Sequence, residues 1–152
     1  MESNEGIKDF YDFATMYCAL ITEDELNREA VPRLIVVLSQ LYACGLVLPE
    51  LQPETDDGPE PGPWPHRVNI SNYIYPFYYS LPDPYSSEPD LADLRDDLAD
   101  IARDLNCGIR EYDAGRVGNA VFFWKFGLDH HFGTHLVNAL AALHEIRTRN
   151  LG

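Results

Sequence analysis

The stretch VGNAVFFWKFGLDHHFGTHLVNALAALHEI, residues 117–146, decides the fold class of this chain. It contains no proline, and its apolar residues recur at helical spacing. At about 100° per residue, one stripe of the helix carries Val117, Val121, Trp124, Leu128, Phe132, Ala139, Ala142 and Ile146. A second apolar row holds Phe122, Phe126, Val137 and Leu140. The sequence therefore predicts one long central helix at about 117–147, with Trp124, Leu128 and Gly133 in the structural core.

Two histidines lie within the first stripe. His131 and His135 are four residues apart, so their imidazoles share one face of the predicted helix. Because that face is the apolar one, we expect both imidazoles on its buried side.

Three further helices are predicted upstream. At about 6–21, a stripe is formed by Ile7, Phe10, Ala14, Tyr17 and Ile21. The second helix, at about 28–48, ends before Pro49. The third, at about 90–113, starts at Asp90, stops before Gly115, and has one face made of Leu91, Leu94, Leu98, Ile101, Leu105, Ile109 and Tyr112. Together the four helices predict a single all-α domain, 1–152, folded as a helical bundle.

The long segment between the second and third helices is different in composition. Residues 49–66 are rich in proline and predict an extended surface loop. Residues 67–88 are rich in tyrosine, and we expect a short helix at about 71–80, broken at Pro76. The tyrosines are expected to pack over one side of the bundle as a lid. The alternative is an exposed aromatic patch for a partner, made of Tyr75, Tyr78, Tyr79 and Tyr85.

The net charge excludes several classes of function. With 25 acidic residues against 11 Lys plus Arg, the chain carries a formal charge of −14. Such a charge argues against binding to nucleic acid or to an anionic membrane and permits a basic protein partner. Solubility alone is the simpler explanation of it. The first ten residues lack the pattern of a signal peptide and no apolar run reaches membrane-span length, so a cytoplasmic location is expected.

Acidic residues form a stripe on the third helix. Asp93, Asp97, Asp100 and Asp104 are spaced by four, three and four residues, with Asp96 beside them. Like charges at this spacing repel by a few tenths of a kcal/mol, so either a ligand offsets the cost or the face lies in water. Candidate binding residues are therefore Asp93, Asp96, Asp100 and Asp104, together with the four tyrosines of the aromatic patch.

The histidine pair admits two interpretations. His131 and His135 could bind one divalent transition metal together with Asp97 and Asp100 of the neighbouring helix. Alternatively, both are core histidines that hydrogen-bond a buried carboxylate or tyrosine, which is the interpretation we favour. No HExxH, GxSxG or phosphate-binding glycine motif occurs, and no catalytic residue is assigned.

The segments LRDDLADIARDL (94–105) and WKFGLDHHFGTHLVNALAALH (124–144) resemble an uncharacterised bacterial family of small, acidic, helical proteins, a domain of unknown function. LYACGLVLPEL (41–51) and YYSLPDPYSSEPD (78–90) are similar to its other recurrent segments. The resemblance singles out Asp96, Asp97, Asp100, Asp104, Trp124, His131, Gly133 and His135, and this chain departs from it by an insertion at about 55–66. It implies a helical fold and a bacterial, cytoplasmic origin, and no activity.

The function predicted from the sequence is that of a non-enzymatic, acidic accessory protein that binds a basic protein partner, in an immunity-type or regulatory role, without a cofactor. The alternative is a metal-dependent hydrolase that uses His131 and His135 with Asp97 or Asp100 and one divalent transition metal. Neither the enzymatic activity nor the oligomeric state follows from the sequence.

Overall fold

The computed structural model describes residues 2–22, 25–60, 62 and 68–149. In these residues it contains five α-helices and one two-stranded antiparallel sheet. The elements in chain order are α1 (Glu2–Ile21), α2 (Ala30–Leu46), β1 (Phe77–Ser80), β2 (Asp90–Asp93), α3 (Leu94–Asp113), α4 (Val117–His130) and α5 (Phe132–Arg149). The predicted all-α bundle is confirmed, with a small hairpin between α2 and α3.

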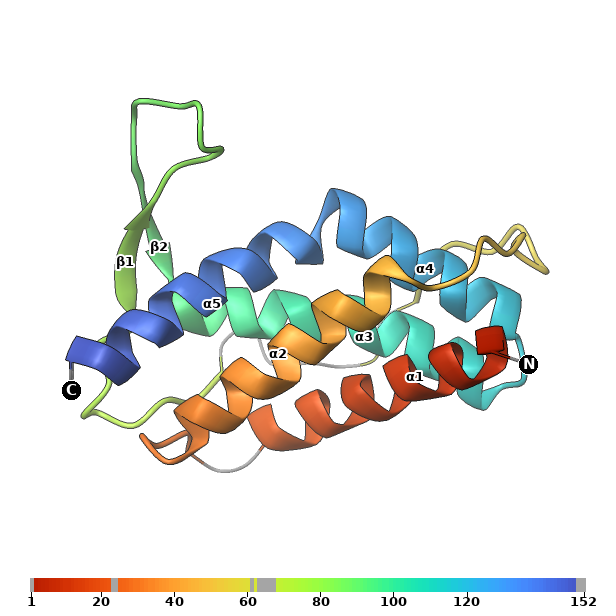
Figure 1. Cartoon of the computed structure of the whole chain (residues 1–152), viewed down its shortest axis with the longest axis horizontal. Helices are drawn as coiled ribbons and strands as arrows, with labels where there is room; N and C mark the ends of the chain where they lie inside the picture. The colour runs from red at the N-terminus through yellow and green to blue at the C-terminus, as the bar shows by residue number, and fades with distance from the viewer. Residues whose placement is uncertain (1, 23–24, 61, 63–67, 150–152) are drawn as a thin grey trace.

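The helices pack around one apolar core, and the hairpin stands away from it (Figure 1). α3 contacts α1, α4 and α5, while α2 covers α1 and α5 from the other side. The largest fully buried side chains come from all the helices of the bundle, and Trp124, Tyr17, Phe10 and Phe132 are the bulkiest of them. α4 and α5 follow one another along one edge of the bundle, as Figure 1 shows, so together they take the place of the one long helix that the sequence predicts.

The predicted apolar face of α1 is confirmed, because all five of its residues are buried. The predicted face of α3 is confirmed from Leu94 to Leu105. Leu91 is an exception, since it lies in β2 with 63% of its surface exposed. α3 begins four residues later than predicted because Asp93, and not Asp90, is its N-cap: the Asp93 carboxylate accepts a hydrogen bond from the backbone N–H of Arg95 (2.9 Å).

The prediction of a single helix over 117–147 is wrong. The backbone leaves the helical conformation at His131 (φ −145°, ψ −79°), which separates α4 from α5. Gly133 sits tightly against α4 at this junction, since a Cβ there would lie 1.9 Å from the carbonyl oxygen of Leu128. The first apolar stripe nevertheless faces the core on both sides of the break, so helical periodicity could not reveal it. Three residues of the second row are exposed, namely Phe122, Phe126 and Val137. Neither α4 nor α5 is therefore buried on all sides, as a central helix would be.

The predicted short helix at 71–80 is also wrong, because this segment makes a turn and then forms β1. β1 pairs with β2 in the register Phe77–Asp93 to Ser80–Asp90, and residues 81–89 join the strands. Aromatic residues such as Tyr78 and Tyr79 favour an extended backbone once a partner strand is available. Upstream, Leu26 and Ile70 form an isolated parallel bridge that holds the segment against the bundle.

The described part of the proline-rich loop, 49–60 and residue 62, contains neither helix nor strand, and residues 61 and 63–67 lie outside the described residues. Asn119 of α4 attaches the loop: its buried side-chain oxygen accepts hydrogen bonds from the backbone N–H of Glu54 (2.7 Å) and of Thr55 (3.2 Å). The Glu54 carboxylate in turn accepts from the backbone N–H of Gly118 (3.1 Å) and so satisfies a donor at the start of α4. Across the described residues, no helix is long and apolar enough to span a membrane.

Candidate functional site

Three aspartates of α3 point toward the junction of α4 and α5. Asp97, Asp100 and Asp104 are spaced by three and four residues, so they lie on one face of α3, beside its apolar stripe. Asp97 is buried, with 8% of its side chain exposed, whereas Asp104 and Asp100 are exposed to 20% and 36%. α3 packs against both α4 and α5, so this face meets the residues of the junction.

The two histidines of the junction each bond one of these carboxylates. Nδ1 of His131 lies 2.6 Å from Oδ2 of Asp104, and Nδ1 of His135 lies 2.8 Å from Oδ1 of Asp97. Because an ionised carboxylate only accepts hydrogen bonds, Nδ1 is the protonated nitrogen in both rings. The ring centroids are 5.0 Å apart. We call Asp97, Asp100, Asp104, His131 and His135 the His/Asp cluster.

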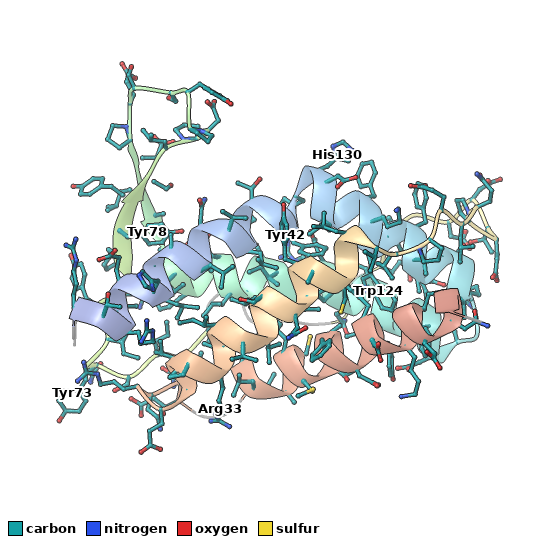
Figure 2. All side chains as sticks on the ribbon, viewed as in Figure 1. Arg33, Tyr42, Tyr73, Tyr78, Trp124 and His130 are labelled. Atoms are coloured by element: carbon teal, nitrogen blue, oxygen red, sulfur yellow. The ribbon has the colours of Figure 1, made fainter. Side chains whose placement is uncertain are left out.

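The hairpin supplies one further member of the network. The hydroxyl of Tyr78 in β1 donates a hydrogen bond to Oδ2 of Asp97, and Figure 2 shows Tyr78 at the base of the hairpin. Burial and this bond to Asp97 raise the pKa of Tyr78 well above its ordinary value, so its phenol is neutral and donates. The hydrogen bond to Asp97 also raises the pKa of His135, more than burial lowers it.

Three possible ligand atoms converge in the cluster. One ring nitrogen each of His131 and His135 and one carboxylate oxygen of Asp100 all lie within 4.8 Å of one another. Nε2 of His135 is 3.5 Å from Oδ2 of Asp100. This arrangement can hold a cation, or it can share protons as a polar network.

The structure corrects the predicted burial of the histidines. His131 is 50% exposed and His135 is 28% exposed, so both lie at the rim of the apolar stripe and not beneath it. Beside His131 and Asp104 opens an apolar pocket of about 380 Å³, lined mainly by Phe122, Phe123 and Phe126. Phe122 and Phe126 belong to the second apolar row, which the helical periodicity of the sequence placed inside the protein.

The predicted acidic binding stripe is not one continuous exposed surface. Asp93 is 8% exposed and forms a salt bridge with Arg95 (2.8 Å), and Asp104 bonds His131. Asp96 is half-buried. The sequence did not predict the hydrogen bond between Asp104 and His131 or the one between Tyr78 and Asp97. Helical spacing placed Asp104 on the same face as Asp97, but nothing in the sequence indicates which carboxylate each imidazole meets.

The second candidate site is the hairpin, and we call residues 75–93 the hairpin arm. Tyr75, Tyr79 and Tyr85 of the arm are exposed to 66%, 74% and 96% of their surface, so the tyrosines do not form the expected lid. Tyr78 differs from them because its hydroxyl is bound by Asp97. The arm is anchored at its base, where the backbone N–H of Leu94 donates to the carbonyl of Pro76 (2.9 Å) and the guanidinium of Arg95 lies 5.3 Å from the ring centre of Phe77.

A groove of about 590 Å³ separates the arm from the bundle. It is lined by residues of the arm such as Tyr79 and Leu81, by Tyr42 and Leu46 at the end of α2, and by Val137 of α5. Tyr79 and Leu81 on the arm side and Leu46 and Val137 on the bundle side are exposed, so both walls of the groove carry apolar side chains.

A family model described as DUF5063, a domain of unknown function, matches residues 2–149. The chain belongs to the DUF5063 family. The resemblance to a domain-of-unknown-function family is thereby confirmed, and membership carries no activity with it. No curated protein matches this DUF5063 chain.

A solved structure shares the DUF5063 chain's fold. The crystal structure of protein BF1032 from Bacteroides fragilis, a structural-genomics target, superposes with a TM-score of 0.71 at 20% sequence identity. The match covers 95% of this chain and 93% of that one. The overall fold is thus also found in an experimental structure of a bacterial protein, and at this identity the likeness concerns the fold alone.

Proposed function

We propose that this protein is a non-enzymatic accessory protein that binds a basic protein partner through its hairpin arm. An immunity-type or regulatory role, in which binding masks or modulates the partner, suits its size and charge. The observation that carries the proposal is an arm that leaves the bundle and presents exposed aromatic rings beside acidic residues.

The aromatic rings are the first support. A two-stranded hairpin contributes little to stability by itself, so exposed tyrosines on it are not explained by the core. Large exposed apolar surfaces mark sites of interaction, and tyrosine is enriched at protein interfaces because a rigid ring carries both an apolar face and a hydroxyl. Among the residues that the structure describes, each strand of the hairpin pairs with one other strand, so a further strand could add to the sheet.

Charge selects the class of partner. The arm contains Asp83, Glu88, Asp90 and Asp93 and has no Lys, Arg or His. The rest of the chain adds to the negative potential, for a net charge of −14. A field of this sign steers basic partners and repels nucleic acid, and the association should weaken as salt screens it.

The test shortens the arm and marks its tip. Since Ser80 and Asp90 are paired, replacing residues 81–89 by Asn-Gly closes the strands with a two-residue turn and preserves their register. In the full chain, a photo-crosslinking amino acid at Tyr85 should capture one basic protein in cells of the organism that encodes it, less efficiently at high salt. The same amino acid at Met16, exposed on α1, is the matched control.

The shortened variant should keep the melting temperature of the wild type and lose the captured partner in a pull-down with that protein. Equal capture from Met16 and Tyr85 would overturn the proposal, and so would undiminished binding by the shortened variant.

A metal-dependent hydrolase is the second candidate, because Asp100, His131 and His135 present three convergent ligand atoms next to an apolar pocket. A metal ion with three protein ligands retains a position for water and lowers the pKa of that water. Hydrolysis of an activated phosphodiester or ester that needs added metal and fails in Asp100→Asn would support it. Equal rates in this variant and the wild type would exclude it.

A further inference from the structure

We propose that Asp100, His131 and His135 form a binding site for one divalent transition-metal ion, and that Asp104 and Asp97 orient the two imidazoles from behind. The site does not depend on whether the hairpin arm binds a partner. Metal-binding histidines usually donate their second ring N–H to a carboxylate, which sets the tautomer and turns the lone pair toward the metal.

Both histidines of the cluster have this arrangement. Nδ1 of His131 donates to Asp104 (2.6 Å) and Nδ1 of His135 donates to Asp97 (2.8 Å), so Nε2 is the nitrogen of each ring that is left to coordinate a metal ion. Here two rings, four residues apart, each have their own carboxylate.

The contact between His135 and Asp100 is the second observation. Nε2 of His135 faces Oδ2 of Asp100 at 3.5 Å. Two ligands of a tetrahedral zinc ion, each at about 2.1 Å from it, are about 3.4 Å apart, so this pair already has the separation that zinc requires.

The surrounding structure holds the carboxylates in place. Asp97 is buried, and its two oxygens have different partners: Oδ1 accepts from the imidazole of His135, and Oδ2 accepts from the hydroxyl of Tyr78, which holds the carboxylate in place. His131 is positioned by the break between α4 and α5, where its own backbone N–H bonds the carbonyl of Gly127 (2.8 Å). A continuous helix through this residue would place its side chain differently.

The donor set selects the class of metal. Two imidazoles and one carboxylate suit zinc, iron(II) or cobalt(II), whereas magnesium and calcium prefer oxygen ligands alone. Half of the His131 side chain is exposed, which leaves one side of the site open for water or a small ligand.

The experiment is calorimetric titration of the metal-free, full-length protein, without a histidine tag, with zinc at neutral pH. Magnesium serves as the comparison. We expect one equivalent of zinc to bind and magnesium not to bind. Cobalt(II) should then show the intense visible absorption of a four- or five-coordinate site, and zinc should displace it.

Variants assign the binding to this cluster. His135→Ala and Asp100→Asn should abolish the one-equivalent step, and Asp97→Asn should weaken it by about 10–100-fold, since Asp97 orients a ligand without touching the metal. His144→Ala removes an exposed histidine of α5 and should change nothing. Asp100 is partly exposed on a helix surface, so Asp100→Asn keeps the test valid if His135→Ala fails to fold.

Zinc binding that is unchanged in Asp100→Asn, or that is lost equally in His144→Ala, would overturn the site. The same conclusion would follow if wild-type protein bound zinc with no defined stoichiometry. The cluster would then be a proton-sharing network in which His135 is an imidazolium between Asp97 and Asp100.

Discussion

Gly108 of α3 is the point where the indole of Trp124 comes closest to a neighbouring backbone. A Cβ at Gly108 would lie 2.1 Å from Nε1 of Trp124. The indole has no room to move, because it is fully buried and its N–H donates to the carbonyl of Leu105 (3.1 Å). At the scale of single residues, the approach of α3 to α4 therefore depends on the absence of a side chain.

We predict that Gly108→Ala destabilises the protein by about 1–3 kcal/mol, because overpacking outweighs the better helix propensity of alanine, which is worth about 1 kcal/mol. Gly6→Ala in α1 is the matched control, since a Cβ there meets nothing within 4 Å. That variant should be neutral or slightly more stable. Urea denaturation of both variants measures the difference, and a change of the same sign in both would contradict the role of Gly108.

At the scale of elements, the turn between α3 and α4 is held by one carboxylate. Glu111 accepts hydrogen bonds from Nε of Arg116 and from the side-chain amide of Asn119 (3.3 Å), and Asn119 also carries the loop at Glu54 and Thr55. Gly115, at φ +84°, lets the chain reverse between the helices. The hydrogen bond from Arg116 is the main reason that the pKa of Glu111 is lowered.

This shift predicts a pH dependence. A carboxyl whose pKa is lower in the folded state stabilises the fold above its unfolded pKa and loses that contribution as pH falls through its folded pKa. Glu111→Gln should therefore cost about 1 kcal/mol at neutral pH, and the difference from wild type should shrink below the ordinary carboxyl pKa of 4.5. Denaturant unfolding of both proteins across the acid range checks this, and a pH-independent difference would contradict it.

At the element scale, sequence patterns failed to predict the structure in two places, the junction of α4 and α5 and the hairpin. Helical periodicity located every helix of the bundle, yet it ran on across His131, because the one-residue break leaves Phe132 and Leu136 facing the core. In the hairpin, Tyr78 and Tyr79 carry no alternating pattern that marks a strand. Their extended conformation comes from pairing with Ala92 and Leu91, which the sequence does not specify.

At the scale of the whole molecule, the excess of acidic residues causes electrostatic repulsion between the carboxylates of the folded chain. A charge of −14 on 152 residues destabilises the compact state, while it keeps copies apart and attracts basic proteins. The 25 acidic residues outnumber the 11 Lys plus Arg by 14. Screening by salt should relieve the repulsion within the protein and weaken attraction to the partner.

We predict that raising sodium chloride from low to moderate concentration stabilises the isolated protein, by an amount on the order of 1 kcal/mol. Neutralising three exposed acids of the loop, as Asp56→Asn, Asp57→Asn and Glu60→Gln, should reduce this dependence on salt. Urea midpoints at several salt concentrations provide the measurement. If salt instead lowers stability, ion pairs such as Arg95 with Asp93 outweigh the repulsion.

The sequence by itself determined the fold class, the family and the apolar faces of the helices. The apolar faces could be predicted because buried residues recur every three to four positions, so a short stretch of sequence is enough to show them. It also placed Asp97, Asp100 and Asp104 on one face of α3 and drew attention to His131 and His135. Only the tertiary structure decided that His131 meets Asp104, that Tyr78 holds Asp97, and that the other tyrosines of the hairpin arm, Tyr75, Tyr79 and Tyr85, are exposed. Those outcomes depend on how α3, α5 and the hairpin pack, and contacts between residues so far apart in the chain leave no periodic signal in it.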